Sequence, residues 1–141
     1  QNFSKIDVQG FTFALNYRMK EAERHKPVLN AGVSYTNLNP QITNPSERNM
    51  ISRYVVESLR HQLGATATLH IHNVSLTTGA KYHKRINYKD YTLLDARLAY
   101  SVKNTFKVYA DMSNLLDVEY IEAAAVPMPG SWYTIGIELF K

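Results

Sequence analysis

The stretch "SLRHQLGATATLHIH", residues 58–72, decides the fold class because its polarity alternates from one residue to the next. The odd positions, from Leu59 to Ile71, are apolar except for His61, and the even positions are polar or glycine. Successive side chains of a β-strand point to opposite faces, whereas a surface helix needs apolar residues every three or four positions. The stretch therefore predicts a strand with one apolar and one polar face.

The same alternation extends outward along most of the chain. It predicts seven strands, at residues 3–18, 28–38, 58–72, 74–86, 91–102, 105–113 and 132–140. Many of these are longer than the five or six residues that are usual in soluble sheets. In the first strand the apolar residues change parity near Gly10, and this change predicts a β-bulge there.

The connectors between the predicted strands differ in length. Tight turns at His72–Asn73 and Val102–Thr105 alternate with long loops at 39–55 and 118–131, although the connector 19–27 is longer than a turn. Short turns on one side and long loops on the other are typical of outer-membrane barrels. No apolar run reaches the roughly 18 residues of a membrane helix, but a tilted barrel strand crosses with roughly 9–11 residues.

Composition and charge limit the function classes. The 141 residues are enough for one domain at most. The net charge of +4 is spread along the chain without a run of like charges, so we expect no nucleic-acid partner. The chain has no cysteine, which excludes disulfides and cysteine-based metal sites. Because no grouping of nucleophile, base and acid emerges, we expect no enzymatic activity.

Alternation alone does not say whether the apolar face meets lipid or a protein core. Aromatic residues that we expect near strand ends, as in the interfacial girdles of a membrane barrel, are Tyr17, Tyr35, Tyr54, Tyr82, Tyr91, Tyr100, Phe106 and Tyr133. The opposite face carries the charged residues Arg60, Lys81, Arg85, Asp95, Arg97, Lys107, Asp111 and Glu138. Charged groups need water or partners, so the pattern favours lipid outside and a wet lumen inside.

Two small constellations on the polar face have a functional and a structural interpretation. His70 and His72 share a face with His83 of the next strand, which is a metal-site pattern or simply a polar lumen lining. Asp95 and Arg97, two positions apart, form either an acid–base pair or an ion pair in the lumen. We favour the structural interpretation in both cases and expect no metal and no cofactor.

The segments "MSNLLDVEY" (112–120) and "PMPGSWYTIGIELF" (127–140) resemble the C-terminal end of TonB-dependent outer-membrane receptors. The residues that carry this resemblance are Asn114, Leu115, Leu116, Asp117, Tyr120, Pro129, Gly130, Trp132 and Phe140. Leu116 and Ser131 replace the phenylalanine and arginine that are common in the family, and Lys141 follows the terminal aromatic. The segments "YTLLDARLAY" (91–100) and "DVQGFTF" (7–13) resemble earlier strands of the same barrels.

The resemblance implies an all-β, antiparallel up-and-down transmembrane barrel of 22 strands. Residues 1–141 would supply its last seven strands, while the plug domain and the earlier strands lie outside this chain. The implied function is import of a scarce large nutrient, cobalamin or a ferric siderophore, across the outer membrane of a Gram-negative bacterium, with Bacteroidota as one possible source. The implied partners are the lipid bilayer, the plug, the inner-membrane TonB complex acting through the plug, and the nutrient.

Outer loops of such receptors commonly carry recognition. The residues expected to contact a ligand or partner there are Arg48, Asn49, Arg53, Tyr54, Tyr88, Tyr120 and Met128. The apolar segment "AAAVPMP" (123–129) could contact the ligand or a surface lipoprotein. Two alternatives stay open: a complete eight-stranded outer-membrane barrel with a structural or adhesive role, and a soluble β-sandwich that acts as a binding module.

Overall fold

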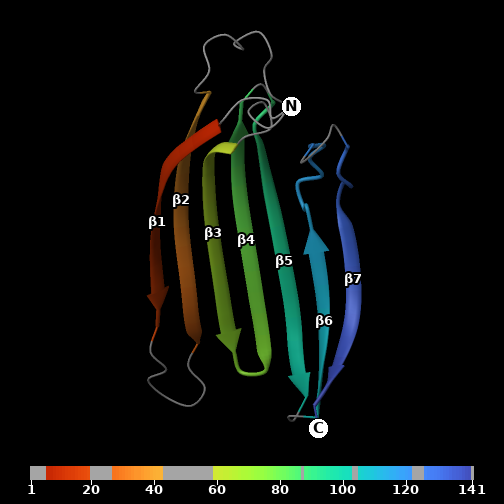
Figure 1. Ribbon diagram of the computed structural model, residues 1–141. Helices are drawn as coiled ribbons and strands as arrows, with labels where there is room; N and C mark the ends of the chain where they lie inside the picture. The colour runs from red at the N-terminus through yellow and green to blue at the C-terminus, as the bar shows by residue number, and fades with distance from the viewer. Residues whose placement is uncertain are drawn as a thin grey trace.

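The computed structural model describes residues 6–19, 27–42, 59–86, 88–102, 105–121 and 126–140. Over these ranges the chain forms one open antiparallel sheet in which the seven strands follow their sequence order (Figure 1). The strands are β1 (Ile6–Arg18), β2 (Val28–Ile42), β3 (Leu59–Ile71), β4 (Val74–Arg85), β5 (Tyr91–Val102), β6 (Phe106–Ser113) and β7 (Trp132–Leu139). In the part of the chain that is described, no helix is long and apolar enough to cross a membrane.

The seven predicted strands are confirmed, and among the boundaries that the structure describes on both sides one differs by more than a single residue. Strand β2 continues to Ile42, so residues 39–42 belong to the sheet and not to the predicted loop. They stay in the sheet because β1 offers partners that far: Gln9 lies opposite Asn39 and Ile6 opposite Ile42. The turn at His72–Asn73 marks one end of the sheet, here named the turn end. The other end, where β4 finishes at Arg85 and β5 begins at Tyr91, is named the loop end (Figure 1).

The predicted β-bulge at Gly10 is wrong. The pairing of β1 with β2 is continuous from Ile6 opposite Ile42 to Arg18 opposite Asn30. The register shift lies instead in β3, where Leu59 faces Arg85 and His61 faces Lys84. The extra residue of this bulge moves Leu59 away from the face that the rest of its apolar set occupies.

The register gives the sheet one apolar and one polar face. Along the apolar face, rows of paired residues such as Leu15, Val33, Ala65, Ala80 and Leu94 run across the strands. These side chains are uncovered: Phe13 is 62% exposed and Ile135 is 80% exposed. Across the described ranges no large side chain is fully buried. The sheet therefore has no conventional core, and its apolar face lacks a covering layer.

The two faces exchange character at the loop end of β1 and β2. At this end, the face that is apolar elsewhere carries Gln9, Asn37 and Asn39. The face that is polar elsewhere carries Val8, Leu38 and Pro40. The parity change near Gly10 in the sequence records this exchange and not an inserted residue. The apolar band thus stops before the strands do.

Successive strands are also displaced along their own direction. One ladder of paired residues crosses the whole sheet through Arg18, Asn30, Thr68, Thr77, Arg97, Asp111 and Thr134. Strand β1 ends on this ladder at Arg18, whereas β7 continues past Thr134 to Leu139. Averaged over the turn end and the loop end, each strand is displaced from the preceding strand by a little over one residue, always in the same direction. A tilted sheet requires such a stagger.

Candidate functional site

The segment after β6 is organised by Asn114, which is one of the few buried polar residues described and is 4% exposed. Its backbone has a φ of 50°, a left-handed conformation that asparagine tolerates better than most residues. Its Nδ2 donates to the carbonyl oxygens of Val118 (2.9 Å) and Pro129 (3.4 Å), and its Oδ1 accepts from the Val118 N–H (3.1 Å). Asn114 therefore ties the start of the loop to its return.

Asp117 makes a second tie between the same two segments. It also has a positive φ, 49°, and its Oδ1 accepts a hydrogen bond of 2.8 Å from the Ser131 N–H. Gly130 lies directly against this oxygen, so that a Cβ at position 130 would overlap it. These residues belong to two separate sequence motifs, and the fold brings the two motifs into contact. We name Asn114, Asp117, Pro129, Gly130 and Ser131 the loop junction.

Tyr120 attaches the loop to the sheet. Its ring lies 4.7 Å from the ring of Tyr91, and the Tyr91 hydroxyl is 2.9 Å from Nδ1 of His83 in β4. The Met128 N–H donates to the carbonyl oxygen of Tyr120, so these two predicted contact residues are neighbours. Tyr91 is buried on the polar face, opposite His83, and its predicted place in an interfacial girdle is therefore wrong.

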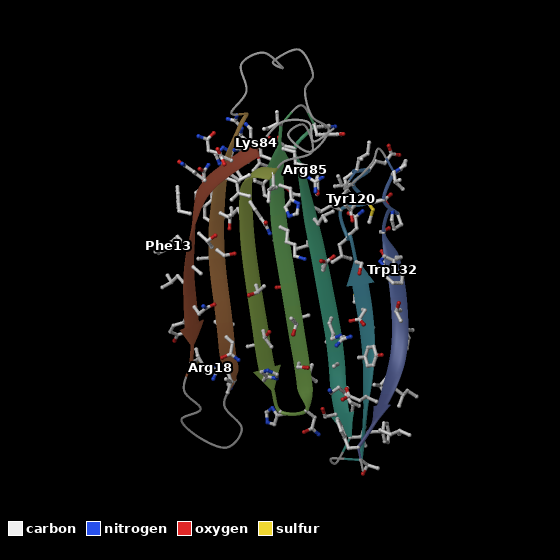
Figure 2. All side chains as sticks on the ribbon, viewed as in Figure 1. Phe13, Arg18, Lys84, Arg85, Tyr120 and Trp132 are labelled. Carbon is white, nitrogen blue, oxygen red and sulfur yellow. The ribbon has the colours of Figure 1, made fainter. Side chains whose placement is uncertain are left out.

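The other residues that were predicted as motif or contact residues do not form one group. The Leu115 N–H donates to the Leu94 carbonyl, while Leu116 is 53% exposed. Trp132 begins β7, and Phe140 lies at the turn end, where its N–H donates to the carbonyl of Thr105. Figure 2 shows Tyr120 and Trp132 at the β6 and β7 edge of the sheet, toward the loop end, and Arg18 at the turn end of the opposite edge. Tyr88 lies in the connector after β4, and the predicted Arg48, Asn49, Arg53 and Tyr54 lie outside the described residues.

Charged residues of the polar face pair across strands and not along them. Arg97 donates from Nη2 to Oδ2 of Asp111 at 2.7 Å and from Nε to Oδ1, which is the bidentate geometry that carboxylates and guanidinium groups favour. The predicted pairing of Arg97 with Asp95 is wrong, because Asp95 accepts the backbone N–H of Asn114 at 3.0 Å. Strand register, which the spacing of two residues in one strand does not contain, decides between these partners.

A layered stack extends the Arg97 pair toward β7. The guanidinium carbon of Arg97 lies 4.6 Å from the centre of the Tyr109 ring, and that ring covers Gly136 on the adjacent strand. Only glycine leaves room for the ring there, because a Cβ at position 136 would overlap it. A second ion pair nearby joins Lys107 Nζ to Glu138 Oε2 at 2.7 Å. Strands β5, β6 and β7 thus present paired charges on the polar face.

A shallow hollow of about 430 Å³ lies on the polar face over β3 to β7. Hydroxyl groups, the Arg97–Asp111 pair, Lys81 and the Trp132 ring line it. Such a surface can hydrogen-bond a polar solute or a protein segment. Lys81 has no charged partner among the residues that the structure describes, so the hollow offers a cation to whatever occupies it.

The three histidines considered as a metal site do not come together. His70 lies opposite Ser75 near the turn end, whereas His83 lies opposite Gln62 near the loop end of the same two strands. No group of three potential metal ligands occurs in the described ranges. The sequence was informative about the shared face but not about the distance along the strands.

Comparison with known proteins gives no match: no family model fits the chain, and neither a curated protein nor a solved structure is detectably similar to it.

Proposed function

We propose that the chain is an arc of an outer-membrane β-barrel that belongs to a transporter of the TonB-dependent kind. The observation that carries the membrane assignment is the uncovered apolar face. Phe11, Phe13 and Leu15 of β1 are each 60% exposed or more, and β7 repeats the pattern with Ile135 and Leu139. Exposed apolar area of this extent is typical of a surface that meets lipid or another protein.

Aromatic residues border this apolar face in the way that membrane interfaces favour. Near the loop end the apolar face carries Phe11, Phe13, Tyr35, Tyr82 and Tyr133, and near the turn end it carries Tyr17, Tyr100 and Phe106. Between Val74 and Tyr82, β4 spans roughly 27 Å along the strand and roughly 20 Å across a membrane at the tilt estimated below. Barrel proteins show an apolar band of about 25 Å flanked by such girdles.

The stagger of the strands supports closure into a barrel. A displacement of a little over one residue per strand, with a rise of about 3.3 Å and a strand spacing of about 4.8 Å, corresponds to a tilt of about 40°. This value lies within the 35–45° that transmembrane barrels adopt.

The directions of the two edge strands restrict how the sheet could close. Strands β1 and β7 both run from the loop end to the turn end (Figure 1). If β7 of one copy met β1 of a second copy, the two would pair in parallel. An all-antiparallel barrel therefore needs an odd number of additional strands between β7 and β1, which gives the even total that bacterial barrels have. A barrel made only of copies of this sheet is disfavoured, because each junction between copies would be parallel.

The loop junction supports the more specific transporter assignment. The residues that resemble the C-terminal motifs of TonB-dependent receptors, Asn114, Asp117, Pro129 and Gly130, form one hydrogen-bonded unit. In this proposal the junction fixes the outer loop between the last two strands, and the polar face with its hollow lines the lumen. The nutrient, cobalamin or a ferric siderophore, passes on that side under the control of a plug driven by the TonB complex.

The membrane assignment is tested with two adjacent residues that lie on opposite faces of β3. Residues 1–141 contain no cysteine. Ala65→Cys and Thr66→Cys, made in the full natural-length protein after any cysteine elsewhere is replaced by serine, therefore each introduce a single thiol. We expect a fluorophore on residue 65 to be quenched by lipids with nitroxide-labelled acyl chains, and a fluorophore on residue 66 to be quenched only by water-soluble agents. A soluble β-sandwich gives no lipid quenching at either position and would overturn the proposal.

The transporter assignment is tested on the protein in its native membrane. An antibody against residues 39–54 should detect a polypeptide of about 70–80 kDa or more, since a plugged barrel of about 22 strands needs that length. Deletion of its gene should abolish energy-dependent uptake of cobalamin or of a ferric siderophore. A membrane-inserted polypeptide near 16 kDa would instead favour the small structural or adhesive barrel.

A further inference from the structure

A small group of polar residues lies on the apolar face at the loop end, where the apolar band stops. His61 of β3 is paired with Asn37 on one side and with Lys84 on the other, so all three share one row of the sheet. The adjacent row toward the turn end contains Tyr35, Leu63 and Tyr82, which belong to the aromatic border. The polar row therefore lies one step beyond that border.

Two donors fix the protonation pattern of the His61 ring. The Nδ1 atom is 2.8 Å from the Tyr35 hydroxyl and 3.1 Å from Nδ2 of Asn37. An amide nitrogen can only donate, so Nδ1 of His61 must accept, and the ring hydrogen resides on Nε2 in the neutral form. Tyr35 and Asn37 thereby orient the His61 ring through Nδ1, and its Nε2–H donates to no other residue that the structure describes.

Lys84 supplies a cation beside this donor. Its side chain is 52% exposed, and its Nζ is 3.9 Å from Oδ2 of Asp90, which is beyond hydrogen-bonding distance. The same Asp90 oxygen already accepts a hydrogen bond of 2.6 Å from the Tyr82 hydroxyl. Figure 2 shows Lys84 at the loop end of the sheet. Lys84 thus has only a loose ion pair with Asp90, which an anion at its exposed ammonium group can replace.

We propose that His61 and Lys84 bind the phosphate of a lipid headgroup in the leaflet at the loop end. The inference depends on the proposed function, because a bilayer around the apolar face places headgroups at the level of this row. The Nε2–H of His61 and the ammonium group of Lys84 donate to phosphate oxygens, while Tyr35 and Asn37 act as positioning residues. In an outer membrane the ligand at this end is the phosphorylated glycolipid of the outer leaflet.

The test measures binding of diphosphorylated lipid A to the full natural-length protein in a neutral detergent, by native mass spectrometry. We expect Lys84→Gln to weaken binding about fivefold, as loss of one cation near a charged lipid surface does. Lys84→Arg should retain affinity. His61→Gln combined with Lys84→Gln should weaken binding further than Lys84→Gln alone. Lys81→Gln is the matched control, because this substitution removes the same charge from the opposite face of β4.

Each outcome decides the proposal. Equal losses in Lys81→Gln and Lys84→Gln, or no loss in Lys84→Gln, would overturn the headgroup site while lipid quenching at residue 65 still supports the barrel. Displacement of lipid A by millimolar inorganic phosphate would show a site for free anions and overturn the lipid assignment. Absence of lipid quenching at residue 65 would overturn the barrel and this site with it. Heat-modifiable migration of each variant on gels verifies that it is folded.

Discussion

The Asp117 carboxylate and Gly130 approach so closely that Oδ1 of Asp117 occupies the space in which a Cβ at position 130 would lie. The same oxygen accepts the N–H of Ser131, the residue that follows Gly130. One contact thus explains why a glycine stands at this point of the loop and why a carboxylate faces it.

Replacing Gly130 with alanine should loosen this contact. The new methyl group would push the carboxylate away and cost its hydrogen bond to Ser131, so we expect the free energy of unfolding to fall by about 1–2 kcal/mol. Urea denaturation followed by gel migration measures this change. Gly79→Ala is the control, since no atom lies within 4 Å of a Cβ at that position. An equal loss in both variants would contradict the proposed contact.

Asn114 should be the most sensitive residue of the loop junction. Asn114→Ala removes three hydrogen bonds and leaves a residue with a side chain at a φ of 50°. We expect a loss of about 2–4 kcal/mol in the free energy of unfolding, because buried groups lose their partners. Asn114→Gly should cost about 1 kcal/mol less, since glycine adopts positive φ easily. If the glycine variant were the worse of the two, backbone conformation would not be a constraint here.

Asp95 and Asp111 should respond differently to neutralisation. Asp95→Asn weakens the acceptor for the Asn114 N–H, so protease cleavage between residues 118 and 131 should become faster. Asp111→Asn releases Arg97 instead and should leave that cleavage rate unchanged, while lowering the melting temperature only slightly, because the pair is exposed. Limited proteolysis with mass spectrometry of the fragments distinguishes the two. Identical cleavage of both variants would speak against the separate roles.

An arginine should be tolerated on one face of β3 and not on the other. Ala67 lies on the apolar face, and the adjacent Thr68 lies on the polar face, opposite Asn30 and Thr77. In a membrane barrel, Ala67→Arg should cost about 2–4 kcal/mol of folding free energy in lipid. Thr68→Arg should cost much less, because it enters a polar lumen. Reversible folding into lipid vesicles provides the measurement, and the opposite ranking would place lipid on the other side.

Sequence reasoning captured the strands because alternation of polarity is a local signal. Each of the seven strands lies where the alternation placed it, and the end of β2 at Ile42 is the described boundary that differs most from its prediction. That end depends on pairing with β1, which local alternation does not contain. The supposed bulge at Gly10 failed for a related reason. Val8 lies opposite Pro40 and on the same face as Leu38, so a local exchange of apolar and polar residues between the faces imitated a change in register.

The site was predicted less completely, since its contacts join distant segments. The motif residues Asn114, Asp117 and Gly130 were recognised, but that Asn114 and Asp117 bind the return of the loop follows only from the fold. The pair of Arg97 with Asp111 needed the register of β5 against β6. The row of Asn37, His61 and Lys84 was missed, although His61 and Lys84 were visible as polar interruptions of two apolar faces. Their shared position across β3 and β4 would have been the signal.

The pairing of every strand with only its neighbours in sequence has an evolutionary consequence. A duplicated or deleted pair of consecutive strands leaves every remaining strand with an antiparallel neighbour and an unchanged direction. The width of such a sheet can therefore grow or shrink by whole hairpins while the loop junction between β6 and β7 is inherited intact. Sheets of this kind can diversify in size through gene rearrangement without losing the contacts of that junction.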